Sequence, residues 1–413
     1  MAAFVTDGNL RSSLAVVRAL GRAGIPVIVG ESHHPCLAGS SKHCTERSYY
    51  PSPQDDPAGF QRALGDLAAS GRFNVLLPMS DVTMQLVAGM RSTLPPTVRI
   101  PIPDEQVILS VQDKRFMVQQ ARQVGIGCPR TVTLEGGEDI QAVAQGLNYP
   151  VVIKPRFSRY LNNGVWVTGP VVYARDPQDL VAKYESVHRL IPHPLIQEMI
   201  PGEGRGVFLL IWDGELKAAL CHRRLREKPP WGGVSVYSET VPLDSALVQQ
   251  SLELLQAIRW QGPAMVEFKL DKREGRAKFM EVNGRFWGSL QLAIDAGVNF
   301  PLLLYRLALG ESVPAQRDYR VGIKSRWLLG DLDSLLIRLR GRNWPNGLPG
   351  SDRSKLKATL DFLKLYESNS RFDVLRFGDL GPGWFEFKDY VRSTLRSLRR
   401  HSPAEVSSEG RST

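Results

Sequence analysis

Residues 264–283 read AMVEFKLDKREGRAKFMEVN, two runs of alternating apolar and polar residues on either side of a polar turn at 271–276. Side chains alternate in direction along a strand, so the apolar residues of the first run predict one buried face and place Glu267 on the other. A turn centred on Glu274 sets Glu267 opposite Glu281. The sequence therefore predicts a β-hairpin whose two strands carry carboxylates that face each other.

Two carboxylates that face each other across a pair of strands repel. A divalent cation between them turns this repulsion into a net attraction. Asn283, two residues beyond Glu281, adds an oxygen that suits a hard ion such as Mg²⁺. Two exposed acids on a solvated sheet face are the alternative interpretation. Arg285 follows closely, where a guanidinium can hold a phosphoryl group in transfer. Its plain alternative is a surface arginine on a turn.

The rest of the chain divides into segments of different pattern. Apolar runs at 2–6, 25–29 and 74–77, separated by amphipathic stretches, predict a parallel sheet covered by helices over residues 1–105. Further along, the apolar run VVIKP predicts a strand that ends near Lys154 and precedes a polar loop at 156–164. The glycine-rich stretch 202–206 is neither a Walker A loop nor GxGxxG, and it is interpreted as a turn.

Five short motifs follow one another between Val107 and Ala308. They are Asp113-Lys114, Val152-Ile153-Lys154-Pro155, Gln197-Glu198-Met199-Ile200-Pro201-Gly202, Met265-Val266-Glu267-Phe268 and Glu281-Val282-Asn283-Gly284-Arg285. Each is weak alone, but together, in this order and at these separations, they are highly specific. In them the chain resembles the ATP-grasp superfamily. The resemblance is closest to its carboxylate–amine ligases and to the single-unit relatives of carbamoyl-phosphate synthase.

The resemblance implies a chain of α/β and α+β class in three parts. A parallel-sheet domain of the kind that precedes ATP-grasp is expected over residues 1–105. A two-lobed ATP-grasp domain is expected over 106–308, with a lid region at about 150–198. A helical C-terminal extension is expected over 309–413, ending in a basic, partly disordered tail.

The resemblance also implies roles for single residues at the nucleotide. Lys114 and Lys154 would contact the phosphates of ATP, and the loop that contains Asn162, Asn163 and Gly164 would close over them. An exposed lysine is common on any surface, so a solvated side chain is the alternative for each lysine.

The adenine and ribose would be held by the segment after the lid. Gln197, Glu198, Met199 and Ile200 would form the adenine hinge, and Glu203 would accept hydrogen bonds from the ribose hydroxyls. For Glu203 an exposed turn acid is the alternative.

The metal and the acceptor substrate complete the implied site. Glu267, Glu281 and Asn283 would hold Mg²⁺, with Mn²⁺ as a possible substitute, and Arg285 would hold the transferring phosphoryl group. Arg223 and Trp231 belong to the stretch that borders the acceptor site in the family, and an exposed basic loop is their alternative.

These assignments predict an ATP- and Mg²⁺-dependent ligase. It would activate a small-molecule carboxylate as an acyl phosphate and join it to an amine, with release of ADP and phosphate. Two further readings stay open within the family: a former of carboxyphosphate and a small-molecule kinase. A nucleotide-binding regulatory module is the alternative of another class.

Composition limits where such a protein works and what it binds. The 413 residues carry a net charge of +10, and the arginines 392, 396, 399 and 400 form a basic cluster near the end. We interpret this as a basic soluble enzyme and expect no nucleic-acid partner, while a homo-oligomer remains possible. Four cysteines without a CxxC pair, and no signal peptide, predict a reduced cytoplasmic protein. No apolar run approaches the ~20 residues that span a bilayer, which argues against a transmembrane enzyme but not against a peripheral one.

Overall fold

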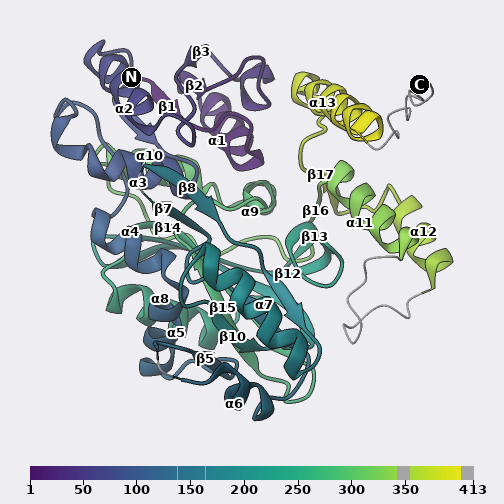
Figure 1. The fold of residues 1–413 in the computed structure, drawn as a ribbon. Helices are drawn as coiled ribbons and strands as arrows, with labels where there is room; N and C mark the ends of the chain where they lie inside the picture. The colour runs from purple at the N-terminus through teal and green to yellow at the C-terminus, as the bar shows by residue number, and fades with distance from the viewer. Residues whose placement is uncertain (137, 163, 342–353, 401–413) are drawn as a thin grey trace, which may run out of the picture.

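The computed structural model describes residues 1–136, 138–162, 164–341 and 354–400. Figure 1 shows an N-terminal domain at the upper left, two lobes below it, and a C-terminal extension on the right. Within the described residues, no helix is both long and apolar enough to cross a membrane. The predicted tail after residue 400 lies outside the described part of the chain.

The N-terminal domain is a parallel sheet covered by helices, as predicted. Its strands are hydrogen-bonded in the order β3-β2-β1-β4, all parallel. The elements are β1 (Ala3–Val5), α1 (Arg11–Arg22), β2 (Val27–Glu31), η1 (Ala38–Ser40), β3 (Glu46–Tyr49), α2 (Pro57–Ala69), β4 (Val75–Leu77), α3 (Asp81–Gly89) and η2 (Arg91–Thr93). Because parallel strands end at one edge, the turns after β1 and β4 bring the starts of α1 and α3 to the same side of the domain.

Two helices, α4 (Glu105–Gln112) and α5 (Lys114–Gln123), lead into a small lobe. Its antiparallel sheet has the order β5-β10-β6-β9. The elements of this lobe are β5 (Thr131–Thr133), α6 (Ile140–Gln145), β6 (Val151–Lys154), β7 (Arg159–Asn162), β8 (Val165–Thr168), β9 (Val172–Ala174), α7 (Pro177–Leu190) and β10 (Leu195–Glu198). The lobe therefore begins about twenty residues before the lid boundary predicted at 150.

A larger, seven-stranded sheet lies beneath the cleft described below, and its strand order is β15-β14-β11-β12-β13-β16-β17. Its strands are β11 (Gly202–Trp212), β12 (Glu215–Lys228), β13 (Val234–Val241), β14 (Gly262–Asp271), β15 (Ala277–Asn283), β16 (Lys324–Arg326) and β17 (Ser370–Phe372). The helices α8 (Ser245–Ala257), α9 (Leu290–Ala296) and α10 (Phe300–Ala308) are inserted between them. The stretch 202–206, which we expected to be a turn, is the first part of β11 and pairs with β14.

The C-terminal extension contains the helices α11 (Leu328–Arg340), α12 (Lys355–Leu363) and α13 (Leu380–Arg400). We expected this extension to be helical, but it also contains β16 and β17, which join the edge of the large sheet. Arg226 and Arg326 both bind the carboxylate of Asp331, at 2.6 Å, and so fasten α11 to β12 and β16. The extension also reaches the N-terminal domain, where Arg18 and Asp379 form a fully buried ion pair at 2.8 Å.

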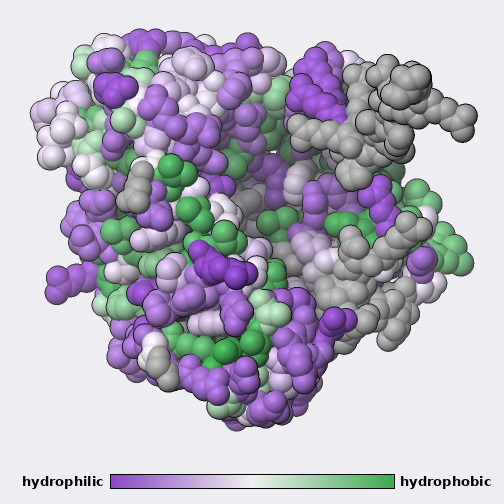
Figure 2. Space-filling view, viewed as in Figure 1, coloured by the Kyte–Doolittle hydropathy of each residue, from purple (hydrophilic) through white to green (hydrophobic). Residues whose placement is uncertain are grey.

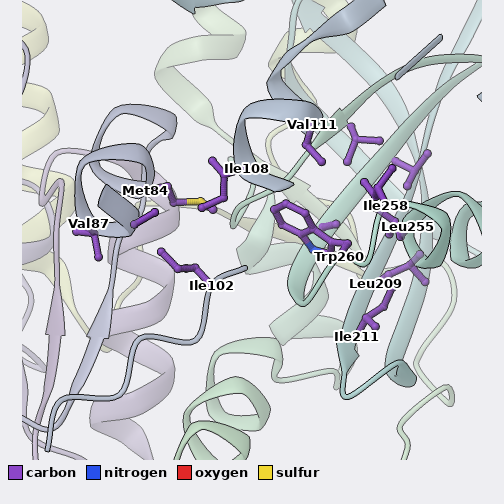
Figure 3. Packing of buried hydrophobic residues seen from close by; sticks show 14 of the residues in the cluster. Met84, Val87, Ile102, Ile108, Val111, Leu209, Ile211, Leu255, Ile258 and Trp260 are labelled. Atoms are coloured by element: carbon purple, nitrogen blue, oxygen red, sulfur yellow. The ribbon is translucent and has the colours of Figure 1, made fainter. Parts of the chain in front are cut away.

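One hydrophobic core joins the N-terminal domain to the large sheet. Figure 3 shows Trp260 between Ile108 and Val111 on one side and Leu255 and Ile258 on the other, and all five are buried. A second core lies on the other face of both sheets, and the small lobe has a core of its own. The domain boundaries at 105 and 308 stay predictions, because buried contacts run across both.

Candidate active site

A cleft of about 910 Å³ opens between the N-terminal domain, the small lobe and the large sheet. Figure 2 shows a hollow near the centre of the face in view. The volume is within the range of sites that enclose small molecules. Most of the residues singled out from sequence line the cleft: Lys114, Lys154, Gln197, Glu198, Met199, Ile200, Trp231, Glu267, Glu281, Asn283 and Arg285.

The paired carboxylates lie on the floor of this cleft. Glu267 on β14 and Glu281 on β15 are direct register partners, which confirms the hairpin prediction. Glu267 Oε1 accepts a hydrogen bond of 2.9 Å from Asn283 Nδ2, and its Oε2 binds Arg224 Nη2 at 2.5 Å. Burial, together with the nearby charge of Glu281, raises the pKa of Glu267. Glu281 makes no hydrogen bond or ion pair with any residue that the structure describes, so its carboxylate is available to a ligand.

This donor set fits a hard divalent cation. One carboxylate is without a protein partner, a second lies opposite it, and the Nδ2 contact of Asn283 with Glu267 leaves the amide oxygen free to accept. Carboxylate and amide oxygens are the donors that Mg²⁺ and Mn²⁺ prefer. In the described ranges, no group of three or more His, Cys, Asp or Glu residues is arranged to hold a metal ion, and the cleft itself offers two carboxylates with the amide of Asn283 as a third donor.

Lys154 ends β6 and points its ammonium group into the cleft region. Its Nζ donates a 2.7 Å hydrogen bond to Gln197 Oε1, which fixes the end of the side chain against β10. Burial lowers the pKa of Lys154 to about 8, and the charges of Lys114 and Lys269 act in the same direction, while that of Glu281 opposes them. An anionic ligand beside Lys154 would reverse this shift, because it favours the charged form.

The predicted lid loop is a β-hairpin in the structure. Strands β7 and β8 pair from Arg159 to Thr168, and Asn163, which we assigned to the lid, lies outside the described residues. Trp166 in this hairpin donates a 3.2 Å hydrogen bond from Nε1 to the carbonyl of Pro53 in the N-terminal domain. Lys114 Nζ reaches the same region and lies 2.7 Å from Ser158 Oγ. The hairpin thus borders the cleft that holds both lysines.

The predicted adenine hinge lies at the end of β10. Gln197 is buried within the strand, where its side chain holds Lys154 and also donates to Thr131 Oγ1 at 3.1 Å. Met199 and Ile200 follow the strand, outside its ladder, and line the cleft. The carboxylate of Glu198 forms an ion pair with Arg273 at 2.7 Å.

Two residues that we assigned to the site are not brought to it. Glu203 binds Arg205 at 2.7 Å, and Arg223 binds Glu239 at 2.7 Å and Glu203 at 3.7 Å; neither Glu203 nor Arg223 lines the cleft. The reason is the strand that replaces the expected turn. Gly206 pairs with Glu267, so odd-numbered residues of β11 project from the opposite face of the sheet.

Arg224, which sequence reasoning missed, takes the position that we expected for its neighbour. It lines the cleft, contacts Glu267 Oε2 at 2.5 Å and Glu227 Oε1 at 3.2 Å, and has an exposed side-chain fraction of only 12%. A step of one residue along a strand exchanges the faces of the sheet. The alternation of β12 decides between Arg223 and Arg224 only once the register of β11 with β12 and with β14 is known.

Arg285 is oriented by the N-terminal domain. Its Nε donates to Asp81 Oδ1 at 3.0 Å, and Asp81 is the first residue of α3. Asp81, and to a smaller extent Glu281 and Glu267, raise the pKa of Arg285, so the guanidinium stays charged in its half-buried position. We did not foresee Asp81, because nothing in its local sequence links it to a residue 204 positions away.

Comparison with known proteins adds the wider context. Residues 191–329 match a family described as ATP-grasp in the biosynthetic pathway with Ter operon. A D-alanine–D-alanine ligase of Chromohalobacter salexigens is 26% identical over 231 residues, 55% of this chain and 63% of that protein, so the match spans less than two thirds of that relative.

Solved structures give the fold. Biotin carboxylase of Campylobacter jejuni in complex with β,γ-ATP matches 78% of this chain and 74% of its own, with a TM-score of 0.63 and 15% identity. L-Amino acid ligase of Bacillus licheniformis matches 76% of this chain and 75% of its own, with a TM-score of 0.58 and 16% identity. The mixed α/β architecture with an N-terminal parallel sheet is similar to that of these two solved proteins.

Proposed function

We propose that this chain, which has the ATP-grasp fold, is an ATP- and Mg²⁺-dependent ligase that joins a small-molecule carboxylate to an amine. A carboxylate oxygen of the first substrate attacks the γ-phosphorus of ATP, the bond from that phosphorus to the bridging β,γ-oxygen breaks, and ADP leaves. The amine nitrogen then attacks the acyl carbon and forms the amide bond. Phosphate departs with the acyl oxygen, and the nitrogen loses a proton.

One observation carries the proposal. A carboxylate without a partner among the described residues, Glu281, lies opposite a second carboxylate on the floor of a cleft that also holds the cations Lys114, Lys154 and Arg285. Such an arrangement suits a polyanion that arrives with a divalent cation, because each compensates the charge that repels the other. The relatives named above include ligases and a protein solved with an ATP complex, which supports the same reading.

The chain's own residues orient the reactants. Lys154, fixed by Gln197, and Lys114, beside Ser158, would neutralise the phosphates, and Arg285, held by Asp81, would bind the group in transfer. Glu267, Glu281 and Asn283 would hold Mg²⁺, which when bound neutralises the charge that develops on the phosphate oxygens. Catalysis by such a site is mainly positioning and electrostatic stabilisation.

The acceptor side of the cleft carries Trp231 and Arg224. Arg224 holds Glu267 through a 2.5 Å ion pair, so we assign it as a positioning residue for the floor of the site. Trp231 lines the cleft beyond Pro229 and would contact one of the substrates. We no longer assign Glu203 to the ribose or Arg223 to the substrate, since both lie on the other face of the sheet.

The test is product analysis with ATP, Mg²⁺ and pooled amino acids and carboxylates. We expect ADP, phosphate and a new amide mass, and a hydroxamate when hydroxylamine replaces the amine. AMP with pyrophosphate would overturn the mechanism, since it indicates an adenylate.

The likeness to biotin carboxylase favours one second candidate, a former of carboxyphosphate. Phosphate release that depends on bicarbonate, without an amide, would select it. Phosphate transferred to a stable product would indicate a small-molecule kinase. Nucleotide binding without any turnover would indicate a regulatory module.

We also propose a reduced compartment such as the cytoplasm, with small molecules as the reactants. Its support is that Cys36, Cys44, Cys128 and Cys221 are all free thiols in the structure. Mn²⁺ is expected to replace Mg²⁺, since it takes the same oxygen donors. We expect no nucleic-acid partner, and sedimentation analysis would show whether the chain forms a homo-oligomer.

A further inference from the structure

The last helix, α13, exposes a row of large apolar side chains. Leu380, Trp384, Phe387, Val391 and Leu395 follow one another at spacings of three or four residues. Four of them are at least half exposed: Leu380 at 53%, Trp384 at 59%, Phe387 at 50% and Leu395 at 52%. These spacings place all five on one side of the helix, and we call this row the apolar stripe. A contiguous exposed stripe of this size marks an interaction surface.

The opposite side of α13 is the one that holds the helix to the protein. Trp327 Nε1 donates a 2.6 Å hydrogen bond to Glu386 Oε1, and Tyr390 donates a 2.6 Å hydrogen bond to Asp333 Oδ1. Phe385 packs against the core beneath. The apolar stripe is therefore not the docking face of the helix but an outer surface.

Basic residues run along the border of the apolar stripe. Lys388 and Arg392, each three residues before a member of the stripe, are exposed and form no ion pair with any residue in the described ranges. Arg396, seven residues after Asp389, lies on the side away from the stripe. Figure 2 shows hydrophilic residues along the visible part of α13. Asp389, the exposed acid of the helix, lies on the side away from the stripe by its spacing. The stripe thus has cations along one edge and no acid beside it.

The acids of the extension that approach this helix point inward instead. Asp379 binds Arg18 at 2.8 Å, Asp373 binds Arg11, and Glu386 accepts from Trp327. These three acids are thereby bound within the protein, while Lys388 and Arg392 carry positive charge on the outside. The outer face of α13 is complementary to a surface that is both apolar and anionic.

We propose that this face binds an anionic lipid bilayer. Trp384, Phe387 and Leu395 would enter the boundary between headgroups and acyl chains, and Lys388 and Arg392 would lie among the anionic headgroups. An apolar stripe with aromatic side chains, bordered by Lys and Arg, is the pattern of helices that lie in a membrane surface. The chain would be a peripheral membrane protein in this respect.

Other occupants fit the observations less well. Residues 401–413 contribute only Pro403, Ala404 and Val406 as apolar side chains, too few to cover the stripe. An antiparallel pairing of two copies, centred on the stripe, would bring Lys388 of one copy beside Lys388 of the other, and like charges repel. Nucleic acid would bind the basic residues but would leave Leu380, Val391 and Leu395 exposed to water.

The test is co-sedimentation of the full chain with phosphatidylcholine vesicles, with and without about 30% phosphatidylglycerol. We expect binding only to the anionic vesicles, and weaker binding at high salt. Lys388→Gln/Arg392→Gln should lower the partition constant about 25-fold, because each basic residue near an anionic surface contributes about fivefold. Trp384→Ser/Phe387→Ser should lower it about tenfold or more.

The matched control is Arg62→Gln/Arg317→Gln, which removes the same charge at two exposed positions without ion pairs in the described structure. It should bind like the wild type. Equal binding to neutral vesicles, or no difference between the α13 variants and the control, would overturn the proposal. So would a dimer that Trp384→Ser/Phe387→Ser dissociates, or DNA binding that only the charge variant loses. Circular dichroism shows whether each variant is folded, and none of the variants touches the cleft.

Discussion

At the scale of single residues, the unpartnered carboxylate of Glu281 gives the sharpest test of the candidate site. Glu281→Gln removes one of two facing charges and one metal ligand. We expect turnover to fall at least ~1,000-fold, since a bound cation contributes several kcal/mol to phosphoryl transfer. Without ligands, the variant should melt at the same temperature or higher, because repulsion with Glu267 is gone.

The control for this experiment is Glu274→Gln in the exposed turn of the same hairpin, which should keep full activity. Normal ATP consumption by a folded Glu281→Gln protein would remove Glu281 from the site. A variant that loses activity and stability together would point to a structural role instead.

Lys154 gives a second residue-scale prediction, about pH. Its pKa is about 8 in the free protein, below the ordinary 10.5, because it is buried. Phosphates beside it favour the ammonium form, so ATP binding above pH 8 should take up a proton, and affinity should fall as the pH rises from about 8. Calorimetry in two buffers of different ionisation enthalpy measures this uptake.

Lys154→Gln should bind ATP more weakly at neutral pH and take up no proton, while Lys272→Gln, at an exposed position, should behave like the wild type. Proton uptake that persists in Lys154→Gln would mean that another group titrates on binding.

At the scale of elements, the alternation of apolar and polar residues predicted those strands and turns that depend only on residues close together in the sequence. The β14–β15 hairpin and the pairing of its glutamates followed from the alternation around Glu267 and the position of the turn, whereas the register shift between Glu267 and Phe268 was not predicted. The glycines of 202–206 misled us, because glycine is common in turns. In the structure Gly206 serves close packing: a Cβ there would come within 2.2 Å of His222 Nε2 on the neighbouring strand. The contacts of Arg224 with Glu267 and of Arg285 with Asp81 depend on which strands and helices meet, and a single sequence does not contain that information.

The contact between α11 and α13 yields a prediction about stability and pH. Burial raises the pKa of Glu386 from 4.5 to about 7, although the hydrogen bond from Trp327 opposes the shift. The folded protein therefore holds this proton more tightly than the unfolded chain, and the contribution to stability is lost as the pH rises from 4.5 through about 7. Glu386→Gln, which keeps an acceptor for Trp327, should raise the free energy of unfolding by about 3 kcal/mol near pH 8 and by less than ~0.5 kcal/mol at 4.5.

Urea denaturation at the two pH values measures this difference. Glu185→Gln, an exposed position, is the control and should show no such dependence. An equal effect of Glu386→Gln at both pH values would show that Glu386 does not titrate between them.

At the scale of the whole molecule, the C-terminal extension closes the chain back onto its beginning. Arg18 in α1 donates to the Asp379 carboxylate at 2.8 Å and to the carbonyls of Asp373 and Val374 at 3.0 and 2.8 Å. Ser41 donates to the same carboxylate at 2.7 Å. Since the large sheet also takes β16 and β17 from the extension, the three predicted parts are expected to unfold together rather than one by one.

Asp379→Asn tests this closure. Burial opposes ionisation of Asp379, but hydrogen bonds from Arg18, Lys42 and Ser41 outweigh it and hold the pKa below its ordinary value. The variant leaves the guanidinium of Arg18 buried without its counter-charge, which typically costs about 3 kcal/mol or more. The folded pKa is the lower one, so the loss of stability relative to wild type should be full above pH 3.8 and shrink as the pH falls further.

Differential scanning calorimetry of Asp379→Asn should show one transition at a lower temperature, whereas Asp389→Asn, at an exposed position of α13, should melt like the wild type. A separate early transition in Asp379→Asn would show instead that the extension is an independent folding unit attached to a stable body formed by the rest of the chain.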